Sequence, residues 1–227
     1  MINRMKCLAV MVAILLAPSW DVAGQDQVKF PHLRVGIDGG YFQPLGAWAE
    51  HRYAQGTDLF GGSATLRGEL ELRMRRLGIA LNASYTKLNT GAWEAYARDR
   101  DDELEASASL TQFGLLLKPY FKMRRPHAVN LEFGLIYSLP SGEERFAGRR
   151  FEYDFLKAVF GFMAGVGYER YLSQSTALTF RLGWMFAPGG VHYADGTTYG
   201  LSGLPATVGI RFDLGGGPAN QGASGGN

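Results

Sequence analysis

Apolar side chains occupy every second position in eight stretches of this sequence, and the positions between them are largely polar residues or glycine. The first stretch runs through Leu33, Val35, Ile37, Gly39 and Tyr41. A period of two is typical of β-strands, because successive side chains of a strand point to opposite faces. The eight stretches, each roughly ten residues long, are 33–41, 64–72, 77–85, 113–121, 129–137, 160–168, 178–186 and 206–214. The pattern predicts an all-β protein, and eight such strands suit a closed, antiparallel, up-and-down β-barrel, either soluble or transmembrane.

Charged residues lie between the apolar positions, and six of them are acidic and six basic. They are Arg34, Asp38, Arg67, Glu69, Glu71, Arg73, Lys118, Glu132, Glu169, Arg181, Arg211 and Asp213. A soluble barrel of the lipocalin kind would also alternate, with its apolar face inside. The alternation alone therefore does not decide which face points outwards, and other features have to do so.

Glycine and aromatic residues distinguish the two faces. Glycines gather on the polar face, for example Gly36, Gly114 and Gly209. The interior of an eight-stranded barrel is narrow, so long arginine and glutamate side chains fit there only beside small neighbours. Aromatic residues such as Tyr85 and Trp184 lie near the ends of the apolar face, as in the aromatic girdles of outer-membrane barrels. Both observations predict that the polar face lines the interior and the apolar face meets lipid.

The predicted connections alternate between short and long. Short ones are expected at 74–77, 122–128 and 170–176, and long ones at 43–62, 87–107, 139–153 and 187–203. Short periplasmic turns and long outer loops are typical of outer-membrane barrels. Pro119 falls on the apolar face of the fourth stretch and cannot donate a ladder hydrogen bond, so it predicts a bulge or the start of a turn.

The two ends of the chain differ from the region between them. Residues 1–24 have a basic start, an apolar run and small residues at their end, which is the layout of a secretory signal peptide. The only cysteine, Cys7, would leave with this leader. Residues 215–227 hold six glycines and no charge and are expected to form a flexible tail. The barrel domain would then span 25–214.

The leader and the eight amphipathic strands resemble the small outer-membrane barrels of Gram-negative bacteria, such as the OmpA transmembrane domain, OmpX and the opacity-type barrels. The resemblance covers about residues 30–214 and implies export to the bacterial outer membrane with cleavage of the signal peptide. The last stretch is also similar to the terminal signal read by the barrel assembly machinery, through Thr207, Gly209, Phe212 and Leu214. The residues that follow are too few for the peptidoglycan-binding domain of OmpA, so that activity is not implied.

Four histidines are the candidates for catalysis or metal binding: His32, His51, His127 and His192. His192 has Asp195 three residues on and Ser202 ten residues on, which are the residue types of a hydrolase triad. The sequence contains neither the His-x-Ser-Asn signature of the lipid A deacylases nor G-x-S-x-G. Four scattered histidines also lack the spacing of a metal site. We therefore expect no enzyme activity and no cofactor, and a lipid-modifying envelope enzyme is the third alternative for the function.

The charged inner face has two interpretations. It could conduct or select solutes, or it could be an ion-pair network that fills and stiffens a small barrel. Equal numbers of acids and bases favour the network, because unpaired buried charge is costly. Eight strands also leave little room for a wide pore. The sequence favours a structural, surface-interaction or envelope-maintenance role, with a narrow channel for ions or small solutes, as in OmpW-like barrels, as the alternative.

The outer loops are the expected place for partners, as loops on a rigid scaffold often are. The stretch 93–105 holds six acids and two bases; it could bind divalent cations or a basic partner, or simply be solvated. Arg145, Arg149 and Arg150 could meet lipopolysaccharide phosphates. The expected partners are outer-membrane lipid, lipopolysaccharide, the barrel assembly machinery and a surface ligand. With 23 basic and 21 acidic residues, nucleic acid is not among them.

Overall fold

The computed structural model describes residues 30–46, 48–49, 60–98, 104–124, 126–146, 149–152, 156–192 and 196–214. The signal peptide predicted at 1–24 and the tail predicted at 215–227 lie outside these residues and stay predictions. No helix in the described part of the chain has the length and apolar character needed to cross a membrane.

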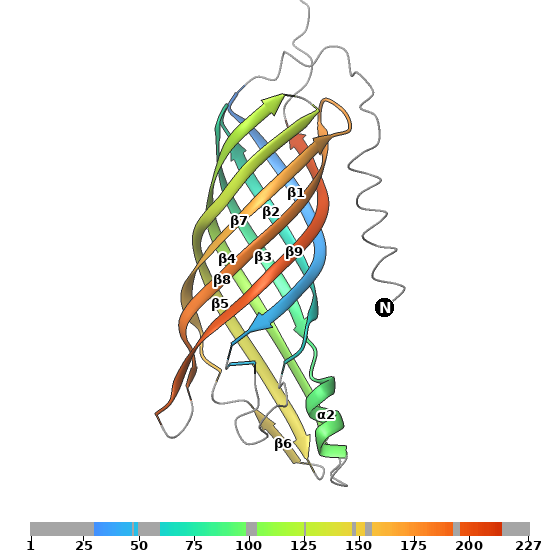
Figure 1. The fold of residues 1–227 in the computed structure, drawn as a ribbon, viewed down its shortest axis with the longest axis vertical. Helices are drawn as coiled ribbons and strands as arrows, with labels where there is room; N and C mark the ends of the chain where they lie inside the picture. Colours follow the sequence, from blue (N-terminus) through green and yellow to red (C-terminus); the bar gives the residue numbers. More distant parts are fainter. Residues whose placement is uncertain are drawn as a thin grey trace, which may run out of the picture.

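Eight antiparallel strands form a closed ring (Figure 1). They are β1 (His32–Leu45), β2 (Ser63–Arg73), β3 (Leu77–Leu88), β4 (Leu104–Arg124), β5 (His127–Phe146), β7 (Val159–Tyr171), β8 (Thr176–His192) and β9 (Thr198–Leu214). Each strand pairs with the next strand of the ring, and β9 pairs with β1 to close it. The predicted all-β, eight-stranded, antiparallel up-and-down barrel is confirmed.

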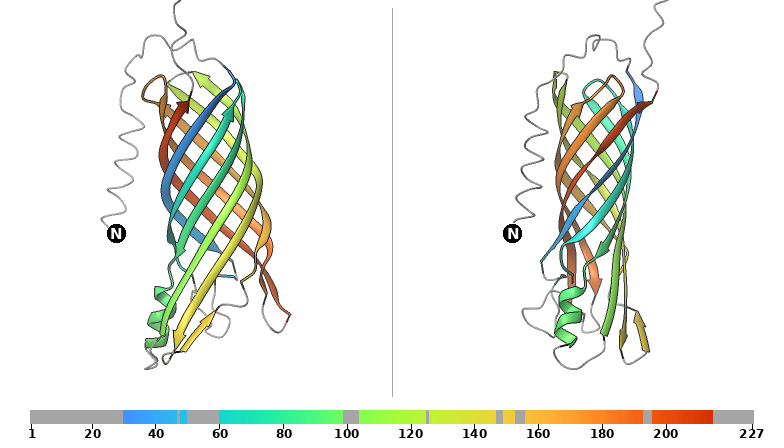
Figure 2. Two further views of the ribbon diagram at one scale, coloured as in Figure 1. Left: turned by 180° about the vertical axis from the view of Figure 1, so that it is seen from behind. Right: turned by 90° about the vertical axis from the view of Figure 1, so that its right-hand side faces the viewer.

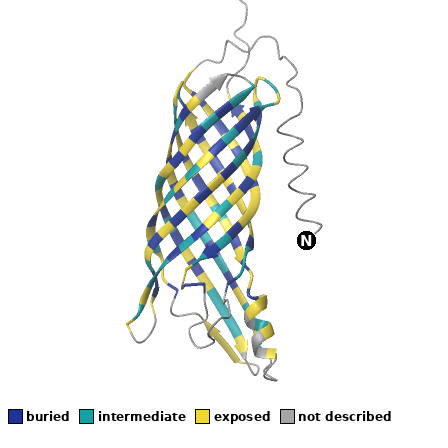
Figure 3. Ribbon diagram, in the orientation of Figure 1, coloured by how far each residue is buried: buried dark blue, intermediate teal, exposed yellow. Residues whose placement is uncertain are grey.

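Buried and exposed residues alternate along every strand of the ring (Figure 3). In β1, for example, Leu33, Val35 and Ile37 are exposed on the outside, whereas Arg34 and Asp38 are buried inside. Because successive side chains of a strand point to opposite faces, this register gives the barrel an apolar outer surface and a polar interior. We call that interior the lumen.

The two ends of the barrel differ in shape (Figure 2). The connections after β2, β4 and β7 are short and lie at one end, called here the turn end, where β1 begins and β9 ends. The longer connections lie at the other end, the loop end. There β4 and β5 extend away from the ring and carry the short strand β6 (Arg149–Glu152) and the helix α2 (Gly91–Arg98). The predicted alternation of short and long connections is therefore present, except at the connection between β8 and β9.

The strands are longer than the roughly ten residues expected, since they run from 11 to 21 residues. The long connection expected at 187–203 is wrong, because β8 continues to His192 and β9 begins at Thr198. The segment Pro188–Gly190 has the composition of a turn, but it forms an irregularity in the β8–β9 pairing. Gly189 there has a φ of 79°, a left-handed conformation that glycine adopts without strain.

A second irregularity lies beside Pro119. The proline stays within β4, and the register of β4 against β5 shifts between Tyr120 and Lys122. A bulge is one of the two features that this proline predicted. The β4–β5 pairing also passes from Leu117 to Tyr120 without including Pro119, which has no backbone N–H to donate.

Candidate functional site: the lumen of the barrel

The structure places all twelve charged residues singled out in the sequence inside the lumen. None of them is more than 8% exposed. They come from seven of the eight ring strands, and only β3 contributes none. Buried charges are tolerated where each has partners of opposite sign, so the pairing among them decides what the lumen can do.

Glu69 is the most heavily shared carboxylate. Arg181 donates to it with two guanidinium nitrogens, at 2.7 and 2.9 Å. Arg67 and Lys118 donate at 2.6 and 2.8 Å, and an Arg211 nitrogen lies 3.2 Å away. One carboxylate on β2 therefore holds four bases that come from β2, β4, β8 and β9.

Two other acids complete this first group of ion pairs. Asp38 lies 3.1 Å from Arg211 and 3.4 Å from Arg181. Glu132 lies 3.3 Å from Arg181 and 3.4 Å from Lys118. Each of these bases therefore has two or more carboxylates within ion-pair distance, which offsets its loss of hydration.

A second group of ion pairs lies closer to the turn end and centres on Arg34. Its guanidinium lies 2.6 Å from Asp213, 3.0 Å from Glu169 and 3.7 Å from Glu71. The Tyr120 hydroxyl donates to Glu71 at 2.8 Å. Tyr120 is not among the charged residues singled out in the sequence, but its hydroxyl takes part in this ion-pair group.

Lys118 joins the two groups, because its ammonium also lies 2.9 Å from Glu71. Arg73 lies 3.6 Å from the same carboxylate. The glycines on the inner face leave the room that these side chains need. A Cβ at Gly36 would overlap the guanidinium of Arg211, so the long arginine fits because residue 36 has no side chain.

Apolar side chains fill the lumen between the ion pairs and the loop end. We call them the apolar plug, and they are Phe42, Trp48, Ala49, Phe60, Leu88, Ala108, Leu110, Ile136, Leu156, Met185, Ala187, Val191 and Leu201. Trp48 and Phe60 come from the connection between β1 and β2, and their rings lie 5.5 Å apart. Trp48 is fully buried, and its Nε1 donates to the Ser202 carbonyl at 2.8 Å. Trp48, Ala49 and Phe60 therefore lie in the mouth of the barrel.

The apolar plug was not predicted from the sequence. Inward positions near the outer ends of the strands, such as Phe42, Leu110 and Met185, are apolar where the alternation led us to expect polar residues. The change from polar to apolar residues at these inward positions was the sequence signal that could have predicted the plug. No such signal existed for Trp48, since it lies in a connection with no periodic pattern.

The candidate catalytic residues are not brought together. His192 contacts the Thr198 hydroxyl at 3.2 Å, and the Ser202 hydroxyl donates to the Leu45 carbonyl at 2.5 Å. In the β8–β9 pairing Ser202 faces Phe186, six residues before His192. Asp195 and His51 lie outside the described residues.

The two remaining histidines belong to local contacts. His32 lies 3.7 Å from Asp213, and a His127 ring nitrogen lies 2.6 Å from the Tyr168 hydroxyl. Within the described part of the chain, no group of three or more histidine, cysteine, aspartate or glutamate residues could hold a metal ion.

The residues of the terminal signal lie on β9, which closes the ring. Phe212 and Leu214 point outwards and pair with Val35 and Leu33 of β1. Thr207 and Gly209 occupy the alternate, inward positions of the strand. The outward pair therefore presents an apolar edge at the seam where the first and last strands meet.

The predicted loop groups are partly described. Of the acidic stretch 93–105, residues 99–103 lie outside the described residues. Glu94 accepts hydrogen bonds from the Thr90 hydroxyl and the Ala106 backbone N–H, so it fastens α2 to β4. Arg145, Arg149 and Arg150 are exposed, and Arg150 forms an ion pair with Glu143.

Comparisons with known proteins bear on the fold. No protein-family model matches the chain, and no curated protein matches it significantly. Neisserial surface protein A is 12% identical, with a TM-score of 0.55 over 80% of this chain and 97% of that one. A major outer membrane protein from Thermus thermophilus is also 12% identical, with a TM-score of 0.55 over 82% of this chain and 100% of that one. The fold is that of the small outer-membrane β-barrels.

Proposed function

We propose that this protein is an integral barrel of a bacterial outer membrane with a structural, surface-interaction or envelope-maintenance role. The filled lumen is the observation that carries the proposal. Ion pairs occupy the half nearer the turn end, and the apolar plug occupies the half nearer the loop end. A solute would have to break several buried ion pairs and displace Trp48 to pass. These costs argue against a channel as the main function.

The outer surface supports the membrane placement. Large apolar side chains are exposed on every strand of the ring, among them Leu66, Leu81, Phe133, Leu182 and Ile210. Exposed apolar patches of this extent are rare on soluble monomers, and lipid is the solvent that suits them. The turn end would face the periplasm and the loop end the outside.

The separation of His192 from Ser202 supports a role without catalysis. A nucleophile and its base need to lie within hydrogen-bond reach of each other. Here the His192 ring contacts the Thr198 hydroxyl on β9, whereas the Ser202 hydroxyl donates to the Leu45 carbonyl on β1. Hydrolysis of lipid A that is lost on changing His192 would instead support the enzyme alternative.

Planar-bilayer recording tests the proposal directly. The purified barrel is expected to produce no steady single-channel currents, because buried ion pairs and the apolar plug occupy the lumen. A shift in gel mobility on heating would first show that the reconstituted sample is a folded barrel. Steady currents from a folded sample would favour the narrow channel and contradict the proposal.

The terminal signal gives a second prediction. If the barrel assembly machinery reads Phe212, then Phe212→Ala is expected to lower the folded fraction in cell membranes several-fold. The matched control is Phe133→Ala on β5, because both side chains point outwards and are 44% and 45% exposed. The folded fraction is measured by heat-dependent gel mobility in a Gram-negative host. Equal losses in the two variants would mean that Phe212 acts through lipid contact alone.

A further inference from the structure

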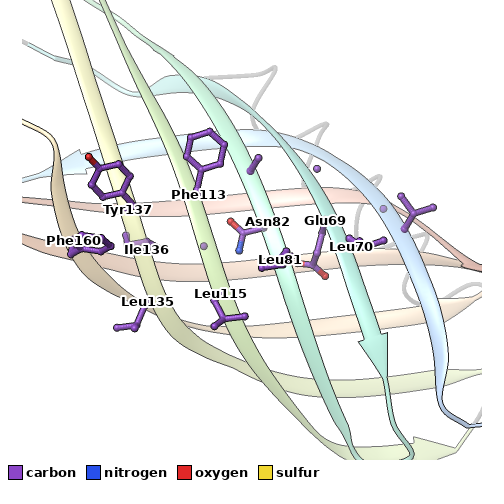
Figure 4. A pocket seen from close by; sticks show the side chains of 15 residues that line it. Glu69, Leu70, Leu81, Asn82, Phe113, Leu115, Leu135, Ile136, Tyr137 and Phe160 are labelled. Carbon is purple, nitrogen blue, oxygen red and sulfur yellow. The ribbon is translucent and has the colours of Figure 1, made fainter.

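Two hollows of opposite polarity lie side by side on the outer surface of the barrel. The first is an apolar furrow of about 750 Å³ (Figure 4). Its floor is formed by Gly68 and Ala83, which face each other across β2 and β3. Leucines and aromatic residues form its walls: Leu70, Leu81, Leu115, Phe113, Tyr137 and Phe160.

Register explains the shape of the furrow. Leu70, Leu81 and Leu115 are paired neighbours on β2, β3 and β4 and form a continuous row. The next row towards the loop end contains Gly68 and Ala83, whose side chains are too small to fill the surface. A Cβ built on Gly68 would meet no atom within 4 Å. The outer surface is therefore open at this point.

The second hollow, of about 690 Å³, is polar and lies towards the loop end. It is lined by Ser107, Ser109 and Ser141, and the hydroxyls of Ser109 and Ser141 lie 2.9 Å apart. Three bases also line it, namely Lys87, Arg150 and Lys157, against the two acids Glu143 and Glu152. Since Arg150 already pairs with Glu143, the two lysines remain against one acid, Glu152, and leave the hollow with a net charge of +1.

The hollows adjoin along a single strand. Ala83 lies on the floor of the furrow, Tyr85 lines the polar hollow and Lys87 lies two residues further on β3. All three side chains are on the outward face. At about 3.3 Å per residue, Ala83 and Lys87 are separated by about 13 Å. An amphipathic ligand could therefore place its apolar part in the furrow and its polar part beside the lysines.

We propose that the two hollows together bind one outer-leaflet lipid with a phosphorylated sugar headgroup. An acyl chain lies over Gly68 and Ala83, and the phosphate lies between Lys87 and Lys157. The serine hydroxyls suit the hydroxyl groups of a sugar, and lysine suits phosphate as a point charge. The inference rests on the proposed function, because it requires the loop end to face the outer leaflet.

A second copy of this barrel would explain the site less well. Contact between two barrels would cover the apolar furrow, but it would leave the lysines and serines of the polar hollow unexplained. A lipid accounts for both hollows, because it is apolar at one end and anionic at the other.

Native mass spectrometry in detergent tests the site, with lipid A and its dephosphorylated form as the probes. The unaltered barrel is expected to retain lipid A and to hold the dephosphorylated form several-fold less. Gly68→Leu fills the furrow, and the double variant Lys87→Glu with Lys157→Glu reverses the charge of the polar hollow. Each is expected to lower the bound fraction of lipid A several-fold.

Ala164→Leu is the matched control, because Ala164 is an exposed, outward residue on β7, across the ring from β2. It should leave lipid A binding unchanged. The site is wrong if the control loses as much lipid as Gly68→Leu, if neither test variant loses any, or if phosphatidylglycerol binds as well as lipid A. Heat-dependent gel mobility of each sample separates these results from failure of the proposed function, in which the unaltered protein would form no membrane barrel.

Discussion

Replacing Glu69 by alanine is expected to lower the free energy of unfolding by about 3–5 kcal/mol, the usual cost of removing one partner from a buried ion pair. This carboxylate serves four buried bases: Arg67, Lys118, Arg181 and Arg211. Asp38 and Glu132 stay within reach of some of them but cannot supply the missing charge. Urea unfolding in phospholipid vesicles, followed by tryptophan fluorescence, measures the loss.

Two further variants separate charge from packing. Glu143→Ala removes an acid whose partner, Arg150, is 59% exposed, so it should cost at most about 1 kcal/mol. Glu69→Gln keeps the shape of the side chain but not its charge, and should be nearly as destabilising as Glu69→Ala. Full stability in the glutamine variant would show that Glu69 acts by filling space, and the ion-pair account of the lumen would then be wrong.

The sequence was sufficient to predict the architecture because a strand has a period of two. Once Leu33 and Val35 were assigned to one face, Arg34 had to lie on the other, and the same argument applied to all eight strands. Cross-strand partners were not predictable, because they depend on how far each strand is shifted against the next. Arg181 and Glu69 are 112 residues apart in the chain, and nothing in their local sequence indicates that they meet.

The predictions that were wrong or missing concern segments where the chain leaves regular alternation of polar and apolar residues. Pro188–Gly190 has the composition of a turn. However, β8 pairs with β9 both before this segment, at Ala187, and after it, at Val191, so the segment stays within the strand. Most side chains of the plug, such as Phe42 and Leu110, lie at inward positions of strands. Buried and exposed residues therefore still alternate there, but the buried residues are apolar. Trp48 lies in a stretch of sequence without a period, so nothing in its local sequence indicated that its side chain would be buried in the lumen.

Trp48→Ala is expected to destabilise the barrel by about 3–5 kcal/mol, as large-to-small changes at buried aromatic sites do. The indole is fully buried and packs against Phe60, and its loss leaves the Ser202 carbonyl without the Nε1 donor. The matched control is Trp184→Ala on β8. That tryptophan points outwards and is 46% exposed, so lipid can fill the space it leaves and the cost should be clearly smaller.

Trp48→Phe tests which part of the indole matters. It keeps an aromatic ring in the plug but removes the hydrogen bond to Ser202, so a loss of about 1–3 kcal/mol is expected from the unpaired carbonyl. Brominated lipids should quench Trp184 and leave Trp48 unaffected, because only the first faces the bilayer. If Trp48→Ala were as stable as the unaltered protein, the connection after β1 would not be anchored in the lumen. If the Trp48→Ala variant stayed folded and conducted ions, Trp48 would be the residue that closes the lumen to ions.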